Sequence, residues 1–248
     1  MAVQTTAASP ITDRERHAAA ALAPRVSLVI PAHDEAPTIA AVIQAARLAL
    51  PGLGEVLVVD DGSTDGTAQV AQSVGVRVLR LEPNRGKGEA LRAGIAEATG
   101  EILAFIDADG QDDPAEFPRL LGAMTPDVAM VIGSRFIGTL YDGSITRSHL
   151  IGNKAITRVF NLLYGTRITD TQAGFRLVRR AALDPTLLRA MRYEIETELC
   201  LHVVQRGGRV VEVPVTRAPR GGGASGFETA RDGLRIMRRM VVGRLLER

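Results

Sequence analysis

Short runs of β-branched and apolar residues alternate with segments of helical spacing over the first 133 residues, and no other feature restricts the fold as much. Runs of five or six residues that predict buried strands lie at 26–30, 55–60, 76–81, 101–106 and 128–133. Segments with apolar residues at helical spacing lie between most of them, at 37–48, 67–74 and 89–98. This order is typical of βαβ units, so we expect an α/β fold whose mostly parallel sheet is covered by helices on both faces.

The pattern loosens after residue 134 and divides the chain into three parts. Residues 1–24 are rich in Ala and Thr and lack long helical periodicity, so we expect a mobile leader. Residues 25–215 form the expected main domain, which also contains helices near 150–163 and 195–206 and a strand at 210–215. Residues 216–248 comprise a glycine-rich loop and a helix that begins near Phe227.

Composition excludes several classes of protein. With 248 residues, 46% of them hydrophobic and 23% charged, the chain has the make-up of a globular protein and not of a disordered or fibrous one. No apolar stretch reaches the roughly 18–20 residues of a membrane-spanning helix. There is no pattern of an export signal, and the single Cys200 allows no intrachain disulfide. We therefore expect a cytoplasmic protein, with no nucleic-acid partner.

Polar residues follow each of the first four expected strands. They are His33-Asp34-Glu35, Asp60-Asp61-Gly62-Ser63, Asn84-Arg85-Gly86-Lys87-Gly88 and Asp107-Ala108-Asp109. Ligands of parallel sheets bind at the carboxyl ends of the strands, where such residues meet. We therefore expect the functional site at this edge of the sheet.

Each of these groups indicates a different chemistry. Asp107 and Asp109 come from one turn and suit a hard divalent cation that is shared with phosphate oxygens. Asp60 and Asp61 either cap the next helix or accept hydrogen bonds from a base or ribose. The glycine-bearing basic loop 84–88 precedes a helix whose N-terminus favours anions. Neither G-x-x-x-x-G-K-[ST] nor G-x-G-x-x-G occurs, which disfavours a P-loop NTPase and a dinucleotide-binding dehydrogenase.

Six ordered motifs together resemble those of family two glycosyltransferases. They are Pro31-Ala-His-Asp-Glu35, Asp60-Asp-Gly-Ser63, Asn84-Arg-Gly-Lys-Gly88, Asp107-Ala-Asp-Gly-Gln111, Gly133-Ser-Arg135 and Asp170-Thr-Gln-Ala-Gly-Phe-Arg176. The resemblance extends from about Val26 to Val215. Within the family it is greatest to dolichol-phosphate mannose synthases and polyprenyl-phosphate glucosyltransferases.

The resemblance implies a GT-A (Rossmann-like) fold, a nucleoside-diphosphate sugar donor and a Mg²⁺ or Mn²⁺ ion. It implies that Asp107, Asp109 and Gln111 lie at the metal, and that Arg135 and Arg147 hold an acceptor phosphate. Asp170 matches a catalytic or acceptor-orienting carboxylate. The residues that it implies at the nucleotide sugar are Pro31, Asp34, Glu35, Asp60, Asp61, Lys87, Asp107, Ala108 and Arg220. The loop after Arg220 departs from the family pattern, because Gly226 stands where a lysine is usual.

The expected reaction moves a hexose from a GDP-mannose or UDP-glucose type of donor to a polyprenyl or dolichyl phosphate. A second possibility keeps the donor and replaces the acceptor by a soluble hydroxyl compound, for which Asp170 would be the general base. A sugar-phosphate nucleotidyltransferase and a non-catalytic sugar-nucleotide-binding protein are alternatives from other classes. The first normally has a Gly- and Arg-rich loop where this chain has Pro31-Ala-His-Asp-Glu35, and the second would not require Asp107 and Asp109.

The C-terminal segment is basic and amphipathic. Residues 214–248 contain eight arginines and three acidic residues, a balance of +5 in a chain of net charge +2. Leu234, Met237, Val241 and Leu245 share one face of the expected helix, and Arg231, Arg235, Arg238 and Arg239 lie beside it. This pattern predicts peripheral contact with an anionic membrane or a membrane-anchored partner. The alternative is that the apolar face packs on the main domain and the arginines are solvated.

Overall fold

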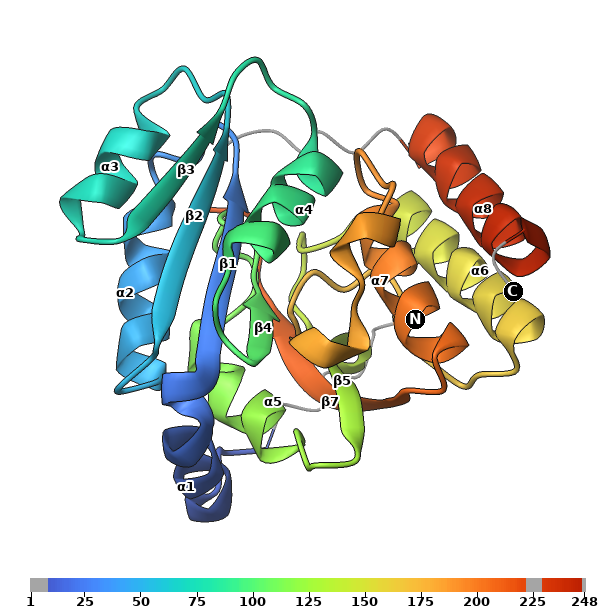
Figure 1. The fold of residues 1–248 in the computed structure, drawn as a ribbon, viewed down its shortest axis with the longest axis horizontal. Coiled ribbons are helices and arrows are strands. Elements are labelled where there is room, and N and C mark those ends of the chain that lie inside the picture. Colours follow the sequence, from blue (N-terminus) through green and yellow to red (C-terminus); the bar gives the residue numbers. More distant parts are fainter. Residues whose placement is uncertain (1–8, 222–228, 247–248) are drawn as a thin grey trace.

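The computed structural model describes residues 9–221 and 229–246, which form one mixed sheet between two layers of helices (Figure 1). Seven strands lie in the order β3-β2-β1-β4-β6-β5-β7. Their bounds are β1 Val26–Ala32, β2 Glu55–Asp61, β3 Arg77–Leu81, β4 Ile102–Phe105, β5 Val128–Leu140, β6 Arg176–Arg179 and β7 Arg209–Arg217. Strand β6 runs antiparallel to both of its neighbours, and the other pairs are parallel. The prediction of an α/β fold with a mostly parallel sheet is confirmed.

Eight α-helices cover the two faces of this sheet in the described part of the chain. Their bounds are α1 Asp13–Leu22, α2 Ile39–Ala49, α3 Thr67–Ser73, α4 Lys87–Glu97, α5 Phe117–Gly122, α6 Arg147–Tyr164, α7 Ile195–Gln205 and α8 Thr229–Leu246. Side chains alternate between the two faces along each central strand, so Leu28 and Ile30 point into one core and Val29 into the other. The first core takes residues from α1, α2, α3 and α5, and the second from α4, α6, α7 and α8.

Two elements escape sequence reasoning because their residues do not show the expected period. Strand β6 has the sequence Arg-Leu-Val-Arg, and its Arg176 is almost fully buried. The Arg176 guanidinium donates to the carbonyl oxygens of Ala173 at 2.8 Å and Glu196 at 2.7 Å, which compensates the burial of its charge. Helix α5 has only six residues, too few to display a helical repeat. Both elements depend on partners that are distant in sequence.

The prediction that residues 1–24 form a mobile leader without a long helix is wrong for residues 13–22, which form α1. A capping box starts this helix: the Thr12 hydroxyl accepts from the Glu15 backbone N–H, and the Glu15 carboxylate accepts from the Thr12 N–H. Ala19 is buried in the core beside α5. The Thr-x-x-Glu signal was present in the sequence, but the alanine-rich run hid the helix. Residues 1–8 lie outside the described part.

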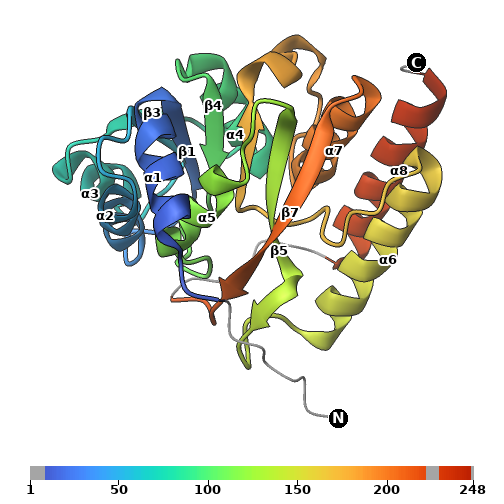
Figure 2. The same cartoon turned by 90° about the horizontal axis from the view of Figure 1, so that it is seen from below.

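Helix α8 lies beside α6 (Figure 2) and packs against α6 and α7, and only part of the predicted apolar face takes part in this packing. Ile236 and Met240 are fully buried, whereas Leu234 is 73% and Val241 43% exposed. The alternative that the predicted apolar face packs on the main domain is therefore wrong for Leu234 and Val241, whereas Met237 of that face is half-buried against the second core. Helical periodicity fixes which residues share a face but not which face is covered. The side chains of Arg231 and Leu245 lie outside the described residues.

The arginines of α8 do not form one uniform strip. Arg239 donates through Nε to the buried Glu198 carboxylate at 2.5 Å, so its charge is used inside the protein. Arg235 pairs with the buried Asp232 at 3.2 Å, and Arg238 is exposed. The prediction that Arg239 faces lipid is therefore wrong. No helix among residues 9–221 and 229–246 is both long and apolar enough to span a bilayer.

Candidate active site

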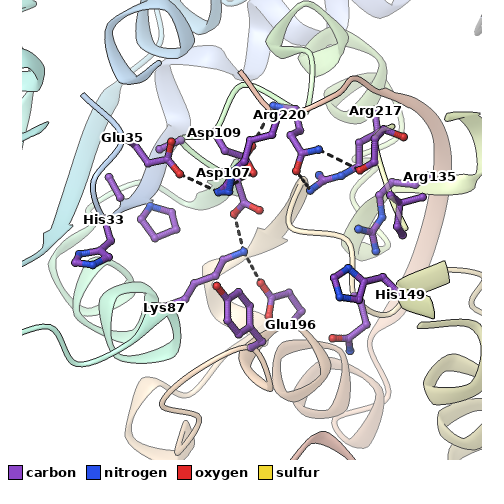
Figure 3. Close-up of a pocket in the computed structure, with 18 of the residues that line it drawn as sticks. His33, Glu35, Lys87, Asp107, Asp109, Arg135, His149, Glu196, Arg217 and Arg220 are labelled. Carbon is purple, nitrogen blue, oxygen red and sulfur yellow. Dashed lines mark hydrogen bonds and ion pairs between the residues drawn. The ribbon is translucent and has the colours of Figure 1, made fainter. Parts of the chain in front are cut away.

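A cavity of about 420 Å³ opens at the carboxyl ends of β1, β2 and β4, where ligands of such sheets bind (Figure 3). Strand β5, the segment before α6, the start of α7 and the end of β7 complete its walls. Of the predicted site residues, those that line the cavity are Pro31, Glu35, Asp61, Lys87, Asp107, Ala108, Asp109, Gln111, Arg135 and Arg220. Asp34, Asp60, Arg147 and Asp170 do not line it.

Lys87, the first residue of α4, bridges two carboxylates on the cavity floor (Figure 3). Its Nζ lies 2.6 Å from Oδ1 of Asp107 and 2.7 Å from Oε1 of Glu196. Burial raises the pKa of Asp107, but the charges of Lys87 and Arg217 more than offset this and lower the pKa overall. Asp107 is therefore held ionised, and Lys87 keeps its proton because the same two carboxylates raise its pKa.

Asp109 and Glu35 share one arginine beside Asp107 (Figure 3). The Arg220 guanidinium is 2.9 Å from Oε1 of Glu35 and 3.3 Å from Oδ2 of Asp109. Burial raises the pKa of both carboxyl groups, and the negative charge of Asp107 raises that of Asp109 further. Burial and mutual repulsion thus disfavour the ionised forms of these carboxyl groups, and a further cation beside them would offset both effects.

Asp107 and Asp109 fit a divalent cation, but Gln111 does not. Mg²⁺ is commonly bound by one or two carboxylates together with substrate phosphates and water. Among residues 9–221 and 229–246, no group of three or more His, Cys, Asp or Glu side chains forms a complete metal site. Two carboxylates that complete their shell with a phosphate ligand agree with this finding and with the raised pKa of Asp109.

The Gln111 amide is engaged with the protein in all its parts. Its Nε2 donates to the carbonyl oxygens of Ser144 at 3.1 Å and Ala218 at 3.0 Å, and its Oε1 accepts from Arg217 at 2.7 Å. Arg217 also forms two 3.0 Å bonds with the Asp112 carboxylate. Gln111 thus ties three loops together at the rim, and the prediction that it is a metal ligand is not supported.

Arg135 on β5 is locked by Asp170. The Arg135 Nε and Nη2 donate to the two carboxylate oxygens at 2.6 and 2.8 Å, and Asp170 is fully buried. Burial raises the pKa of Asp170, but Arg135 outweighs this effect and lowers it overall. A carboxylate with a lowered pKa and no exposed surface is a poor general base, so Asp170 acts on the cavity only through Arg135.

The other predicted acids hold the loops after β1, β2 and β3 in place through hydrogen bonds to backbone N–H groups. The Asp61 carboxylate accepts from the backbone N–H groups of Arg85 at 2.8 Å and Gly86 at 2.7 Å. Asp60 accepts from the Ser63 N–H at 3.1 Å, so it shapes its own turn, away from the cavity. Asp34 has a positive φ of 53° and accepts from the Thr64 N–H at 2.8 Å. Asp34 and Asp60 thus build the site without lining it.

The predicted anion site at the N-terminus of α4 is filled by the protein itself. The Gly88 N–H donates to the Met191 carbonyl at 3.0 Å. A Cβ atom on Gly88 would lie 2.6 Å from the Ala190 carbonyl oxygen, so the glycine allows this close contact. The loop glycines therefore serve backbone packing, and Lys87 provides the positive charge.

Several lining residues were not assigned to the site from the sequence. They are His33, Ser144, Thr146, His149, Asn153, Gln172, Tyr193, Glu196 and Arg217. His33 and Gln172 belong to recognised motifs but received no role, and the others lie outside those motifs. Arg147 is exposed at the start of α6, directly after the lining residue Thr146 and two residues before the lining residue His149. Thr146 caps α6 by accepting from the His149 N–H at 3.3 Å, and this cap turns the helix start toward the cavity.

The family model for glycosyl transferase family 2 matches residues 27–187, which contain most of this cavity wall. The chain belongs to glycosyltransferase family 2. Its relatives include the glycosyltransferase AglJ of Haloferax volcanii, 32% identical over 84% of this chain and 68% of AglJ. The polyprenol monophosphomannose synthase of Mycolicibacterium smegmatis is 32% identical over 81% of this chain and 80% of the synthase.

The fold is also similar to a solved glucosyl-3-phosphoglycerate synthase from Mycobacterium tuberculosis in complex with Mn²⁺, UDP-glucose and phosphoglyceric acid. The TM-score is 0.76 at 26% identity, and the match covers 97% of this chain and 86% of that one. This similarity confirms the predicted GT-A fold.

The Arg135–Asp170 pair yields a prediction on stability. Asp170→Asn leaves the buried Arg135 without a charged partner and should lower the free energy of unfolding by about 3–5 kcal/mol. Since folding lowers the pKa of Asp170, the pair stabilises fully above the unfolded pKa near 4 and is lost as the pH falls through the folded value. Urea denaturation should show the largest deficit of the variant above about pH 4 and a shrinking deficit below it.

The exposed Asp142 provides the matched control for this substitution. Asp142→Asn should change the free energy of unfolding by less than about 0.5 kcal/mol. Equal stability of Asp170→Asn and Asp142→Asn at pH 7 would show that the Arg135–Asp170 pair does not stabilise the fold.

Proposed function

We propose that this protein transfers a hexose from a nucleoside-diphosphate sugar to a polyprenyl phosphate. The observation that carries the proposal is a cavity with the carboxylates Asp107 and Asp109 on one wall and the immobilised Arg135 on another. Family membership favours glycosyl transfer over the nucleotidyl-transfer alternative. The relative from M. smegmatis is named as a polyprenol monophosphomannose synthase, which supports a lipid phosphate as acceptor.

The donor diphosphate belongs beside Asp107 and Asp109. A divalent cation supplies charge neutralisation of the leaving diphosphate when it is bound there, and a solved relative with Mn²⁺ and UDP-glucose supports this role. Arg220, which links Glu35 to Asp109, is placed to contact the same phosphates once they enter. Lys87 holds Asp107 in its ionised form and orients it through the contact with Glu196.

The acceptor phosphate belongs near Arg135. The two hydrogen bonds from Arg135 to Asp170 fix the plane of the guanidinium group, so Arg135 binds a phosphate with little loss of side-chain entropy. A phosphate monoester is already ionised near neutral pH and requires positioning, whereas a hydroxyl acceptor requires a base. Asp170 is the base expected for a hydroxyl acceptor, but it is fully buried and its pKa is lowered, so it cannot take this role. This favours a phosphate as the acceptor.

A soluble acceptor is the second candidate. The solved glucosyl-3-phosphoglycerate synthase of similar fold binds phosphoglyceric acid, a soluble compound, together with UDP-glucose, which supports such an acceptor. In that case Glu196 is a candidate for the base, because it lines the cavity and its Oε2 accepts no hydrogen bond from the described residues. Donor and acceptor screening against both acceptor classes distinguishes the two candidates.

A lipid acceptor requires access to a membrane surface, and α6 together with α8 provides a suitable face. Helix α6 contains no acidic residue, and its exposed side includes Lys154, Arg158, Ile151 and Leu162, the last two 69% and 85% exposed. Leu234, Arg238 and Val241 are also exposed, at helical spacing on α8, which lies beside α6 (Figure 2). Mixed basic and apolar surface of this kind suits peripheral binding to anionic lipid.

Metal dependence gives the first functional prediction. Asp109→Asn should lower transfer by at least about 10³-fold, because cation stabilisation of the leaving group contributes several kcal/mol. Its melting temperature should be equal or higher, since the substitution removes a buried charge whose pKa is raised. Calorimetry with Mn²⁺ should show weakened binding, while Asp13→Asn on α1 should behave as wild type. Undiminished transfer by Asp109→Asn would refute the role of Asp109.

The acceptor role of Arg147 gives the second functional prediction. Arg147→Ala should raise KM for a detergent-solubilised polyprenyl phosphate about tenfold or more, because a charge-assisted hydrogen bond contributes about 1.5–3 kcal/mol. KM for the donor should not change. The exposed Arg167 after α6 serves as control, and Arg167→Ala should leave both values unchanged. An unchanged acceptor KM in Arg147→Ala would remove this residue from the acceptor site.

Vesicle binding gives the third functional prediction. The protein should float with anionic vesicles at low salt and be released at high salt. Lys154→Gln with Arg158→Gln should weaken this binding about ten- to thirtyfold, at about 1 kcal/mol per basic residue. Arg14→Gln with Arg206→Gln removes the same charge elsewhere on the exposed surface and should have little effect. Wild-type protein that stays unbound at low salt would contradict the membrane contact and favour the soluble acceptor.

A further inference from the structure

A second cavity of about 260 Å³ lies between α6 and α8 and adjoins the active-site cavity. Its walls are mostly apolar or small, and it is lined by His149, Gly152, Asn153, Ala155, Ile156, Val159, Gly233 and Met237. His149 and Asn153 also line the active-site cavity. The two cavities therefore meet at His149 and Asn153. The active-site cavity is lined by many charged groups, and the second cavity is mostly apolar.

Gly233 has no packing reason to be a glycine. A glycine inside a helix costs about 1 kcal/mol relative to alanine, so its presence needs an explanation. The other glycine of α8, Gly243, is explained by contact, because a Cβ atom there would lie 2.4 Å from Cδ2 of Leu201. A Cβ atom on Gly233 would meet no heavy atom within 4 Å. The missing side chain leaves open space, and that space is the cavity beside α6.

We propose that this α6–α8 groove binds the first isoprene units of the acceptor lipid, while the phosphate lies in the active-site cavity near Arg135. The inference rests on the proposed function and adds to it the place of the chain and a role for α8. A ligand that bridges both cavities must carry an anionic group at one end and an apolar chain at the other, which describes a prenyl phosphate. Apolar walls with a few polar groups at one end are typical of such sites.

The surroundings of the groove give the chain a way out. Ile151 and Leu234 are 69% and 73% exposed, and each directly precedes or follows a glycine of the groove wall. Both belong to the apolar and basic face that we assign to the membrane. A chain that leaves the groove between α6 and α8 would therefore enter lipid without crossing a polar surface. A bulky head group or a folded partner would not fit a space of this size.

The test is to fill the groove from α8 and measure binding of farnesyl phosphate by calorimetry with the full chain. Gly233→Leu should weaken binding about tenfold, which corresponds to the lost burial of about two methylene groups. Gly233→Ala is the matched control, because it changes the helix backbone in the same way but adds only one carbon, and it should bind within about threefold of wild type. Ala155→Leu fills the groove from α6 and should reproduce the loss if Gly233→Leu does not fold.

A parallel assay separates this inference from the function on which it rests. In Gly233→Leu, KM for polyprenyl phosphate should rise by the same factor as the farnesyl phosphate dissociation constant, while KM for the sugar nucleotide stays constant. Wild-type-like binding by both Gly233→Leu and Ala155→Leu, in an enzyme that uses polyprenyl phosphate, would overturn the groove assignment alone. A wild-type enzyme that ignores polyprenyl phosphate and glycosylates phosphoglyceric acid would overturn the proposed acceptor, and the groove assignment with it.

Discussion

The burial of carboxylates at the carboxyl end of β4 is the constraint on which the rest of the site depends. Asp107 and Asp109 lose hydration where the sheet ends, and each ionised group needs a positive partner to remain there. Lys87 comes from α4 and Arg217 from β7, so elements on both sides of β4 supply this charge. Gly174 approaches Asp107 so closely that a Cβ atom would lie 3.0 Å from its Oδ2. The site is thus assembled by charge compensation between distant segments.

These compensating contacts leave the cavity incompletely neutralised. Arg220 serves two carboxylates whose pKa values are both raised, whereas Asp170 devotes its charge to Arg135. One arginine is therefore fixed by a buried partner, and the other is shared between groups at the cavity surface. The fixed one suits a positioning role toward an acceptor, and the shared one suits exchange with an incoming cation and diphosphate. The two arginines differ in function because their partners differ in burial.

Helix α8 shows why amphipathic pattern alone misleads. Its sequence presents an apolar stripe and a basic stripe, and the simplest interpretation buries the first against the protein. In the structure the buried contacts are made by Ile236, Met240 and the Arg239–Glu198 pair, while Leu234 and Val241 remain exposed. Gly233 also lines the groove against α6. One side of α8 therefore packs on the protein, another is exposed, and a third lines this groove. Such a division requires a partner helix, which local sequence does not specify.

The sequence by itself determined the order of the strands and helices apart from α1, α5 and β6, the sheet edge that holds the site, and the pair Asp107 and Asp109. These follow from local periodicity, from strand ends and from short motifs, which depend on residues close in the chain. The tertiary structure decided that Glu196, His149 and Arg217 join the cavity, that Asp170 is sealed behind Arg135, and that Gln111 is spent on loop contacts. Burial and ion pairing decide these roles, and both arise only when segments distant in sequence pack against one another.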